Sequence, residues 1–481
     1  MASVRKALLL TVASNGTGIA LQMVVIVVLS RLLTPAEVGV YSVAAVLTGL
    51  AGVLRDFGVG EYLIQEKDLT DEKIRAAITA NIAVSWTVCI VLFLLARPMS
   101  VFYAETGVGN VLEVLALGFL VTPFGAVAMA FLRREMRFHA MYWATLVSGV
   151  GSGAVAIILA YRGFGYMSLA WSSLVSSMLI VVVSLVLRPA HLPFWPGFKG
   201  LRQVLHFGTH MTGTYLFAHI GRGAPDLVIG RMIDMQGVGL FSRAGGALEL
   251  IHRFVLRGIR PVMLPYFSAQ RRAGAELKQG YLRWVALVTG VTWPVIAILG
   301  LMAYPAIRLL YGQQWLASVP LMQVLCAALA IEIVFLTASE ILIAAGRVAS
   351  SSRLQLVTQS IRIAAIIGSA AFGLLAVSLA LLAAAVVNAG ITIAALHRAI
   401  DMNRSDLFAA CGPSLAPTLV AALPSVGVLA WAGVGEENFV AAALFSGILG
   451  AAAWLASVIW LRHPLGLEVV GAWHRLRGRE G

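Results

Sequence analysis

Charged residues are scarce in this 481-residue chain: only 12% of it is Asp, Glu, Lys or Arg, whereas 60% is hydrophobic. Soluble proteins average about 25% charged residues, so a water-soluble fold of this size would lack the charge to cover its surface. Intrinsic disorder is excluded as well, because it requires few apolar residues. The composition therefore predicts a polytopic membrane protein whose long apolar runs set its architecture.

Cysteine is also rare. The three cysteines, Cys89, Cys326 and Cys411, lie far apart in apolar stretches. This number and spacing exclude a disulfide scaffold and a cysteine zinc site. We expect all three to be free thiols buried among apolar side chains.

Catalytic and nucleotide-binding motifs are missing too. None of the five lysines follows a glycine, which excludes a Walker A motif, and no H-E-x-x-H sequence occurs. Acidic residues are few in the predicted outer loops, where an enzyme of glycan assembly would present catalytic carboxylates. We therefore predict no catalytic residue, no metal site and no cofactor. The outer-loop acids are Glu37, Glu105, Asp234, Glu436 and Glu437.

Fourteen stretches are apolar enough to be membrane spans of about 20 residues. The first is too long for a cleavable signal peptide. A twelve-helix arrangement is the alternative, because the seventh and eighth stretches carry many charges and almost no loop separates the eleventh from the twelfth. The predicted spans are 8–30, 38–54, 76–96, 111–132, 141–160, 165–187, 207–230, 238–260, 282–303, 320–342, 354–373, 374–396, 410–432 and 439–461.

The basic residues alternate between the two sides of the membrane. With the N-terminus inside, the inner segments hold 24 Lys and Arg residues and the outer segments only 5. Cytoplasmic loops carry such an excess, so the pattern predicts that both termini are cytoplasmic. It also accounts for the net charge of +13 without a nucleic-acid partner.

An internal repeat is visible at an offset of 200 residues. Residues 31–44 match residues 231–244 at Arg, Val-Gly, Ser and Ala, and Tyr41 aligns with Phe241. In both copies the segment joins an outward-going helix to an inward-going one, which predicts parallel halves with a substrate site between them. The predicted parts are a six-helix lobe at 1–190, a second six-helix lobe at 191–400, two further helices at 401–461 and a basic cytoplasmic tail at 462–481.

The eighth predicted span is unusually charged. At 100° per residue, its five charged residues fall within an arc of about 120°. An arginine at the bilayer centre costs about 2.5–3.5 kcal/mol on insertion scales, so such residues face a bundle interior or a wet cavity. The five are Arg243, Glu249, Arg253, Arg257 and Arg260.

Other spans add to this set. His219, Arg222 and Asp226 lie three and four residues apart in the seventh span, so they share a helix face and Arg222 could pair with Asp226. Arg362 lies in the eleventh span. Together these residues predict a cationic, water-filled cavity for an anionic group, because the arginine fork binds phosphate or carboxylate with two hydrogen bonds.

A second interpretation applies near the inner boundary of the eighth span. Arg257 and Arg260 come just before Pro261, where long basic side chains can reach the lipid headgroups. For these two residues lipid contact is as good an explanation as substrate binding, and it remains a weaker alternative for Arg253.

Four short motifs resemble those of a known family, the Wzx-type exporters of lipid-linked oligosaccharides. This family is a branch of the multidrug/oligosaccharidyl-lipid/polysaccharide superfamily. The resemblance is spread from residue 1 to about 400, and the order and position of the motifs make it specific. The motifs are the outer turn Ser30–Tyr41, the segment Asp56–Gln65, the outer motif Tyr311–Trp315 and the inner turn Ala345–Arg347.

The resemblance implies a flippase of the bacterial inner membrane. Relatives move an undecaprenyl-diphosphate-linked repeat unit by alternating access, and they act beside polysaccharide polymerase and export machinery. Arg222, Arg243, Arg253 and Arg257 would hold the anion, with Arg55 and Arg362 as further candidates. Asp226 and Glu249 would tune these arginines or couple an ion. The two extra helices, about 407–461, would form a groove for the lipid tail.

Two other functions stay open. An ion-coupled drug antiporter of the same superfamily should favour a membrane-embedded acid, whereas this chain favours arginine. A polymerase, ligase or acyltransferase of glycan assembly should present a large outer loop or a buried His/Asp pair, and neither is evident. A purely structural scaffold fits least well, since it would not need charges in its spans.

Overall fold

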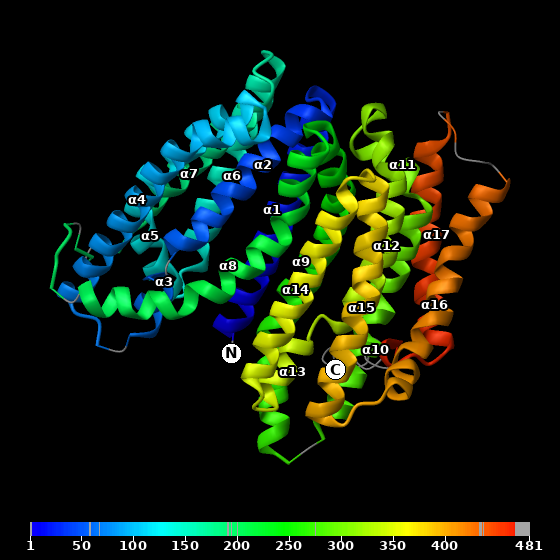
Figure 1. The fold of residues 1–481 in the computed structure, drawn as a ribbon. Coiled ribbons are helices and arrows are strands. Elements are labelled where there is room, and N and C mark those ends of the chain that lie inside the picture. Colours follow the sequence, from blue (N-terminus) through cyan, green and yellow to red (C-terminus); the bar gives the residue numbers. More distant parts are fainter. Residues whose placement is uncertain are drawn as a thin grey trace. The chain divides into compact units, whose positions relative to one another are not determined.

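The computed structural model describes residues 2–56, 59–66, 68–189, 192–193, 195–199, 201–274, 276–431, 435 and 437–466. Within these ranges the chain forms helices and no strand, which confirms the predicted all-α class (Figure 1). The chain divides into two compact units, Met1–Gly239 and Leu240–Gly481. Each unit is described by itself.

The described residues of the first unit form eight helices and the first turn of a ninth. Helix α9 continues into the second unit. The bounds are α1 Ala2–Leu32, α2 Pro35–Asp56, α3 Val59–Gln65, α4 Asp71–Tyr103, α5 Thr106–Arg134, α6 Phe138–Tyr161, α7 Tyr166–Val186, α8 Leu201–Met232 and α9 Met235–Arg272.

The second unit contains the rest of α9 and the helices that follow it. The bounds are α10 Leu277–Leu301, α11 Ala303–Leu310, η1 Gln313–Ser318, α12 Val319–Glu332, η2 Ile333–Phe335, α13 Ala338–Ala344, α14 Val348–Ala370, α15 Leu374–Ile400, α16 Arg404–Trp431 and α17 Phe439–Trp460.

Each of the fourteen predicted spans falls on a helix, although the tenth is broken into α12, η2 and α13. Ten helices in the searched part of the chain are long and apolar enough to cross a membrane. The other four are α1, whose apolar run covers only Gly16–Leu32, and the charge-bearing helices α8, α9 and α14. The count of fourteen spans and the predicted lobe boundaries therefore stay predictions.

Helix pairs with small residues at their contacts build the first unit. Helix α4 packs on α5, α5 on α7, and α6 on α7. On α5, Gly125 lies so close to Val181 that an added Cβ would meet the Val181 backbone at 2.9 Å. Small residues allow membrane helices to approach closely, because lipid offers no hydrophobic force to press them together.

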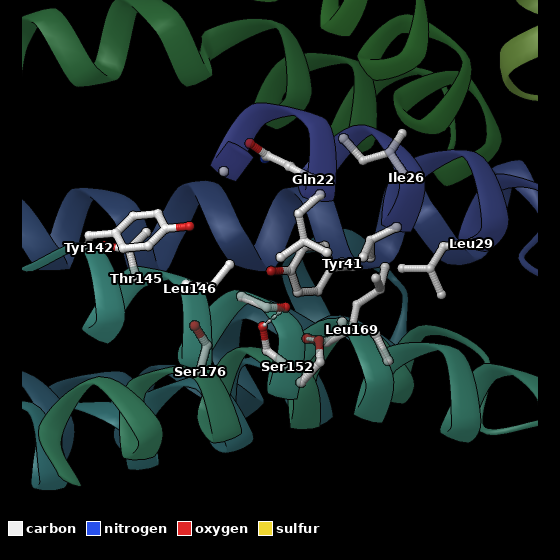
Figure 2. Close-up of a pocket in the computed structure, with 17 residues that line it drawn as sticks. Gln22, Ile26, Leu29, Tyr41, Tyr142, Thr145, Leu146, Ser152, Leu169 and Ser176 are labelled. Atoms are coloured by element: carbon white, nitrogen blue, oxygen red, sulfur yellow. Dashed lines mark hydrogen bonds between the residues drawn. The ribbon is translucent and has the colours of Figure 1, made fainter. Parts of the chain in front are cut away.

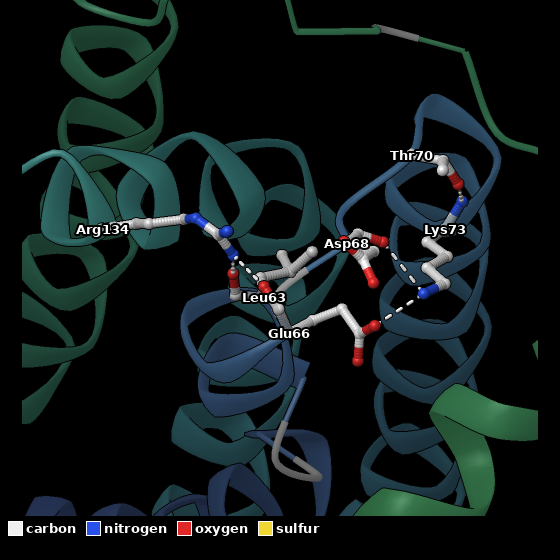
Figure 3. A network of polar contacts seen from close by, with 6 residues as sticks. All are labelled: Leu63, Glu66, Asp68, Thr70, Lys73 and Arg134. Atoms are coloured by element: carbon white, nitrogen blue, oxygen red, sulfur yellow. Dashed lines mark hydrogen bonds and ion pairs between the residues drawn. The ribbon is translucent and has the colours of Figure 1, made fainter.

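A polar network fixes the loop between α3 and α4 in the first unit (Figure 3). Arg134, at the end of α5, donates from one Nη1 to the carbonyl oxygens of Leu63 (2.5 Å) and Glu66 (2.8 Å). Lys73 Nζ lies 2.6 Å from a Glu66 carboxylate oxygen and donates to the Asp68 carbonyl at 2.9 Å. The Arg134 bonds thus satisfy two carbonyl groups at the end of α3, which have no partner within the helix.

In the second unit, α16 packs on α10 and α17, and α12 and α14 pack on α15. A buried histidine beyond α17 closes a cluster of hydroxyl groups. His463 Nδ1 accepts from the Leu465 N–H at 3.1 Å, so the ring proton is on Nε2, which bonds Ser414 Oγ at 3.1 Å. Ser414 Oγ in turn lies 2.8 Å from Thr289 Oγ1.

The cysteines behave as expected. Cys89, Cys326 and Cys411 are buried and free, which confirms the prediction that they pack as small apolar side chains.

Candidate functional site

The two copies of the internal repeat have the same local structure. Two residues separate α1 from α2 and α8 from α9, which begin at Pro35 and Met235. Thr34 caps α2 together with Glu37, whose carboxylate accepts from the Thr34 N–H (2.7 Å) and hydroxyl (2.8 Å). Asp234 caps α9 through the Gly237 N–H at 2.5 Å. The sequence match at an offset of 200 residues therefore corresponds to a real structural match.

The starts of α2 and α9 also contact each other reciprocally within the first unit. A Cβ added to Gly39 would collide with the Met235 carbonyl oxygen, and one added to Gly239 would collide with the Pro35 carbonyl oxygen. Each glycine is the fifth residue of its helix. The two helix starts thus meet at equivalent positions, and neither contact leaves room for a Cβ.

The predicted charges of the first unit lie on α2 and α8, which pack together. Arg55 is in the last turn of α2, with its guanidinium 5.6 Å from the ring centre of Phe119. Arg222 of α8 is exposed and Asp226 is partly buried. The pairing of Arg222 with Asp226 stays a prediction.

Arg243 is the best-defined cation of the second unit. Its guanidinium carbon lies 5.5 Å from the Tyr311 ring centre and 5.2 Å from the Trp315 ring centre. Trp315 is fully buried. Ser318, just after Trp315, donates to the Leu240 carbonyl at 2.8 Å and so ties this aromatic wall to the start of α9. A guanidinium over two aromatic faces is attracted by their quadrupoles.

The N–H donors of Arg243 have no hydrogen-bond acceptor among the described residues. Its Nε is buried without a partner, and among the described residues no hydrogen bond is formed by its terminal nitrogens, which are not buried. The aromatic rings therefore hold the charge in place without neutralising it. Such a group can donate two parallel hydrogen bonds to a phosphate or carboxylate.

The other predicted site residues differ in their surroundings. Arg362 of α14 forms an ion pair with Glu332 of α12, with 3.2 Å between Nη1 and Oε1. Glu249 of α9 is partly buried. Arg253 and Arg257 are not among the residues whose side chains the structure describes. The structure thus places Arg243 and Arg362 in different settings, one against aromatic rings and one beside an acid.

An apolar groove of about 680 Å³ runs between α16 and α17 of the second unit. These two helices lie side by side (Figure 1). Among the described residues that line the groove, Asn438 is the single polar one, and the other walls include Val428, Trp431, Phe445 and Leu449. The groove offers a long chain of apolar carbon atoms a place to bind.

Sequence reasoning missed the partnership between Arg243 and the outer motif. Tyr311 and Trp315 stood out in the sequence only as part of the motif Tyr311–Trp315, about 70 residues from Arg243. The aromatic-Gly-x-x-Trp pattern gave a signal, because Gly312 has a φ of 103° and makes the turn that presents both rings. The sequence did not indicate which cation they would meet.

Comparisons with known proteins agree with this fold. The family model described as "Polysaccharide biosynthesis protein" matches residues 28–320. The chain is 23% identical over 341 residues to the teichuronic acid biosynthesis protein TuaB of Bacillus subtilis (strain 168), covering 68% of each chain. It is 23% identical over 384 residues to the lipopolysaccharide biosynthesis protein WzxC of Escherichia coli (strain K12), covering 77% of this chain and 76% of the relative.

Among solved structures, the lipid II flippase MurJ in an inward closed conformation superposes with a TM-score of 0.76 at 15% identity. The match covers 95% of this chain and 99% of that chain. At this level of identity the likeness shows the fold.

Proposed function

Because the chain belongs to the polysaccharide biosynthesis protein family, we propose that it is a flippase and not an enzyme. It moves a lipid-linked, anionic oligosaccharide repeat unit from the inner to the outer leaflet of the bacterial inner membrane by alternating access. The names of its relatives TuaB and WzxC support a role in polysaccharide biosynthesis. The MurJ fold supports a lipid-linked substrate.

Arg243 carries the proposal. The Arg243 guanidinium is partly removed from water and has no counter-ion among the described residues, and such desolvation disfavours the charge unless an anion offsets it. The rings of Tyr311 and Trp315 offset part of this penalty, but they leave the hydrogen-bond donors of Arg243 unused. The diphosphate of a lipid-linked sugar supplies both the missing charge and the missing acceptors.

The remaining predicted residues extend this anion site. Arg222, Arg55, Arg253 and Arg257 guide the diphosphate, while Asp226 and Glu249 tune these arginines or couple an ion. Arg362 contributes less than Arg243, because Glu332 already neutralises it.

By this proposal the lipid tail binds in the apolar groove of the second unit. The groove between α16 and α17 supports the idea that the polyprenyl chain stays against these helices while the polar headgroup moves. Burial of apolar carbon there contributes roughly 25 cal/mol per Å² of surface removed from water. The substrate, by this proposal, is undecaprenyl-diphosphate-linked.

The basic residues support the orientation of the chain. Their excess on one side supports a topology with both termini in the cytoplasm, in which the two predicted six-helix lobes alternate around the substrate. A polysaccharide polymerase and export machinery receive the product on the outer face.

The test is transport in proteoliposomes. The purified chain is reconstituted with a fluorescent polyprenyl-diphosphate oligosaccharide, and exposure is followed with a membrane-impermeant quencher. We expect protein-dependent exposure, with Arg243→Ala at least about tenfold slower, since hydrogen bonds to a charged group contribute roughly 1.5–3 kcal/mol each. Arg308→Ala is the matched control, because Arg308 also lies over an aromatic ring, Phe439 at 5.0 Å, but already donates to the Tyr304 hydroxyl.

Two results would contradict the proposal. If Arg243→Ala transported normally at equal protein levels, the anion site would be wrong. If no exposure occurred with several headgroups and imposed ion gradients, an ion-coupled antiporter using an embedded acid such as Asp226 would become the better explanation.

A further inference from the structure

A cavity of about 400 Å³ lies within the first unit, between α1, α2, α6 and α7 (Figure 2). Its volume is within the range of about 300–1,000 Å³ that holds small molecules. None of the 17 described residues that line it is charged. Its polar side chains include Gln22, Tyr41, Tyr142, Thr145, Ser152 and Ser172.

Three hydroxyl groups of this cavity use their protons on their own helices. Thr145 donates to the Met141 carbonyl (3.0 Å), Ser152 to the Gly149 carbonyl (3.3 Å), and Ser172 to the Leu169 carbonyl (2.9 Å). A hydroxyl carries one proton and two acceptor lone pairs. The oxygen atoms of these three side chains therefore remain as acceptors.

The Ser176 hydroxyl also uses its proton, in a hydrogen bond to Ser148. Ser148 donates to the Ser176 carbonyl at 3.0 Å, and the two hydroxyl oxygens are 2.8 Å apart. The Ser148 proton is thus used, so the Ser176 hydroxyl is the donor between them and its own lone pairs stay open.

Two side chains supply donors as well as acceptors. Tyr142 and Gln22 form no hydrogen bond with the described residues, and Figure 2 shows them on different walls, Tyr142 on α6 and Gln22 on α1. The cavity therefore presents many acceptors and a few donors, together with the apolar surfaces of Tyr41 and Leu29.

This chemistry favours a neutral ligand over an ion. A cation held here would lack a carboxylate to offset the loss of its hydration, and an anion would lack a basic partner. Acceptors without charge instead match a molecule that has several O–H donors of its own. Glycines on α6 keep the wall close to α1, since a Cβ on Gly149 would meet Leu21 at 3.0 Å and one on Gly153 would meet Val25 at 2.6 Å.

We infer that this hydroxyl-lined cavity binds an uncharged sugar ring of the transported glycan. The inference rests on the proposed function and deepens it, because it assigns the neutral glycan to the first unit and leaves the diphosphate to the arginines. Selectivity for the sugar then resides in α1, α6 and α7 and not in the arginines.

The test compares binding of two lipids to the full chain by native mass spectrometry. One lipid is bare undecaprenyl diphosphate, and the other carries a neutral hexose or N-acetylhexosamine. The variant is Thr145→Val/Ser152→Ala/Ser172→Ala, which folds because each helix carbonyl keeps its main-chain bond. Ser184→Ala is the matched control, since Ser184 is a buried α7 serine that donates to the Ile180 carbonyl outside the cavity.

The wild type should bind a glycosylated lipid more tightly than the bare one. The triple variant should reduce that preference about tenfold or more, since each lost hydrogen bond contributes roughly 0.5–1.5 kcal/mol. Binding of the bare lipid should not change, and the control should keep the full preference.

Other results would overturn the inference. An undiminished preference in the triple variant, or equal wild-type binding of both lipids, would refute the sugar site and leave the flippase proposal intact. Loss of Na⁺ binding or of an organic cation in the triple variant would assign the cavity to a cation. If neither lipid bound the wild type, the flippase proposal would fail, and the sugar site would fail with it.

Discussion

The two units hold their polar groups in opposite ways. In the first unit, hydroxyl and amide groups line an open cavity whose described lining residues carry no charge. In the second unit, a guanidinium lies against two aromatic rings, and the main hydroxyl cluster is closed by the imidazole of His463. The first unit therefore offers neutral polar groups and the second unit offers a cation. This difference suits a substrate with a neutral glycan and an anionic diphosphate.

The largest effect is expected at Gly39 and Gly239, where the starts of α2 and α9 contact each other. Gly39→Val and Gly239→Val each place side-chain carbon where a carbonyl oxygen lies, so we expect loss of folded protein for both. Gly49→Ala, in the same helix as Gly39 with open space around it, is the control and should express normally. The yield of monodisperse protein in size-exclusion chromatography measures this. Tolerance of valine at only one of the two positions would show that the two glycine contacts are not equivalent.

The next prediction sharpens the contrast between two arginines of the second unit. Arg243→Ala should slow flipping at least about tenfold, whereas Arg362→Ala should stay within about threefold, because Glu332 already pairs with Arg362. Initial rates of headgroup exposure in proteoliposomes measure both. Equal losses would mean that the ion pair opens during transport and that Arg362 also binds the substrate.

A smaller effect concerns a polar contact of the first unit. Thr79 donates to the Gly197 carbonyl (2.7 Å) and accepts the Gly197 N–H (2.9 Å), which fixes the chain after α7 onto α4. Thr79→Val should destabilise this attachment by about 1–3 kcal/mol and speed proteolysis near residue 197. Lys199→Ala should have no measurable effect, because Lys199 and its partner Glu72 are 81% and 62% exposed. An equal response to both changes would contradict the role of Thr79.

The smallest effect depends on pH and tests the closed hydroxyl cluster of the second unit. Burial lowers the pKa of His463 from its usual value near 6.5. The unfolded chain therefore binds a proton at this group before the folded chain does, so stability should fall as pH drops below about 6.5. His463→Gln should remove this part of the pH dependence, whereas His397→Gln, at an exposed site, should not. Apparent Tm in detergent at pH 7.5 and 5.5 measures it, and an unchanged slope in His463→Gln would refute the assignment.

Particular residues show which features of the fold could be predicted from the sequence. The match of residues 31–44 to 231–244 predicted two equivalent segments, and the structure shows the same caps and equivalent glycines, Gly39 and Gly239, in both. The apolar runs located a helix for each predicted span. The short helices α3 and α11 and the break at Ile333–Phe335 were not expected, since hydropathy averaged over about 20 residues cannot resolve them.

The sequence by itself determined the membrane class, the helix positions, the repeat and the presence of arginines within the spans. These follow from hydropathy and charge, which are properties of each stretch alone. Only the tertiary structure decided that Tyr311 and Trp315 flank Arg243, that Glu332 pairs with Arg362 and that four helices enclose an uncharged cavity. The partner of a side chain depends on which helices pack together, and the pattern along one helix does not encode that choice.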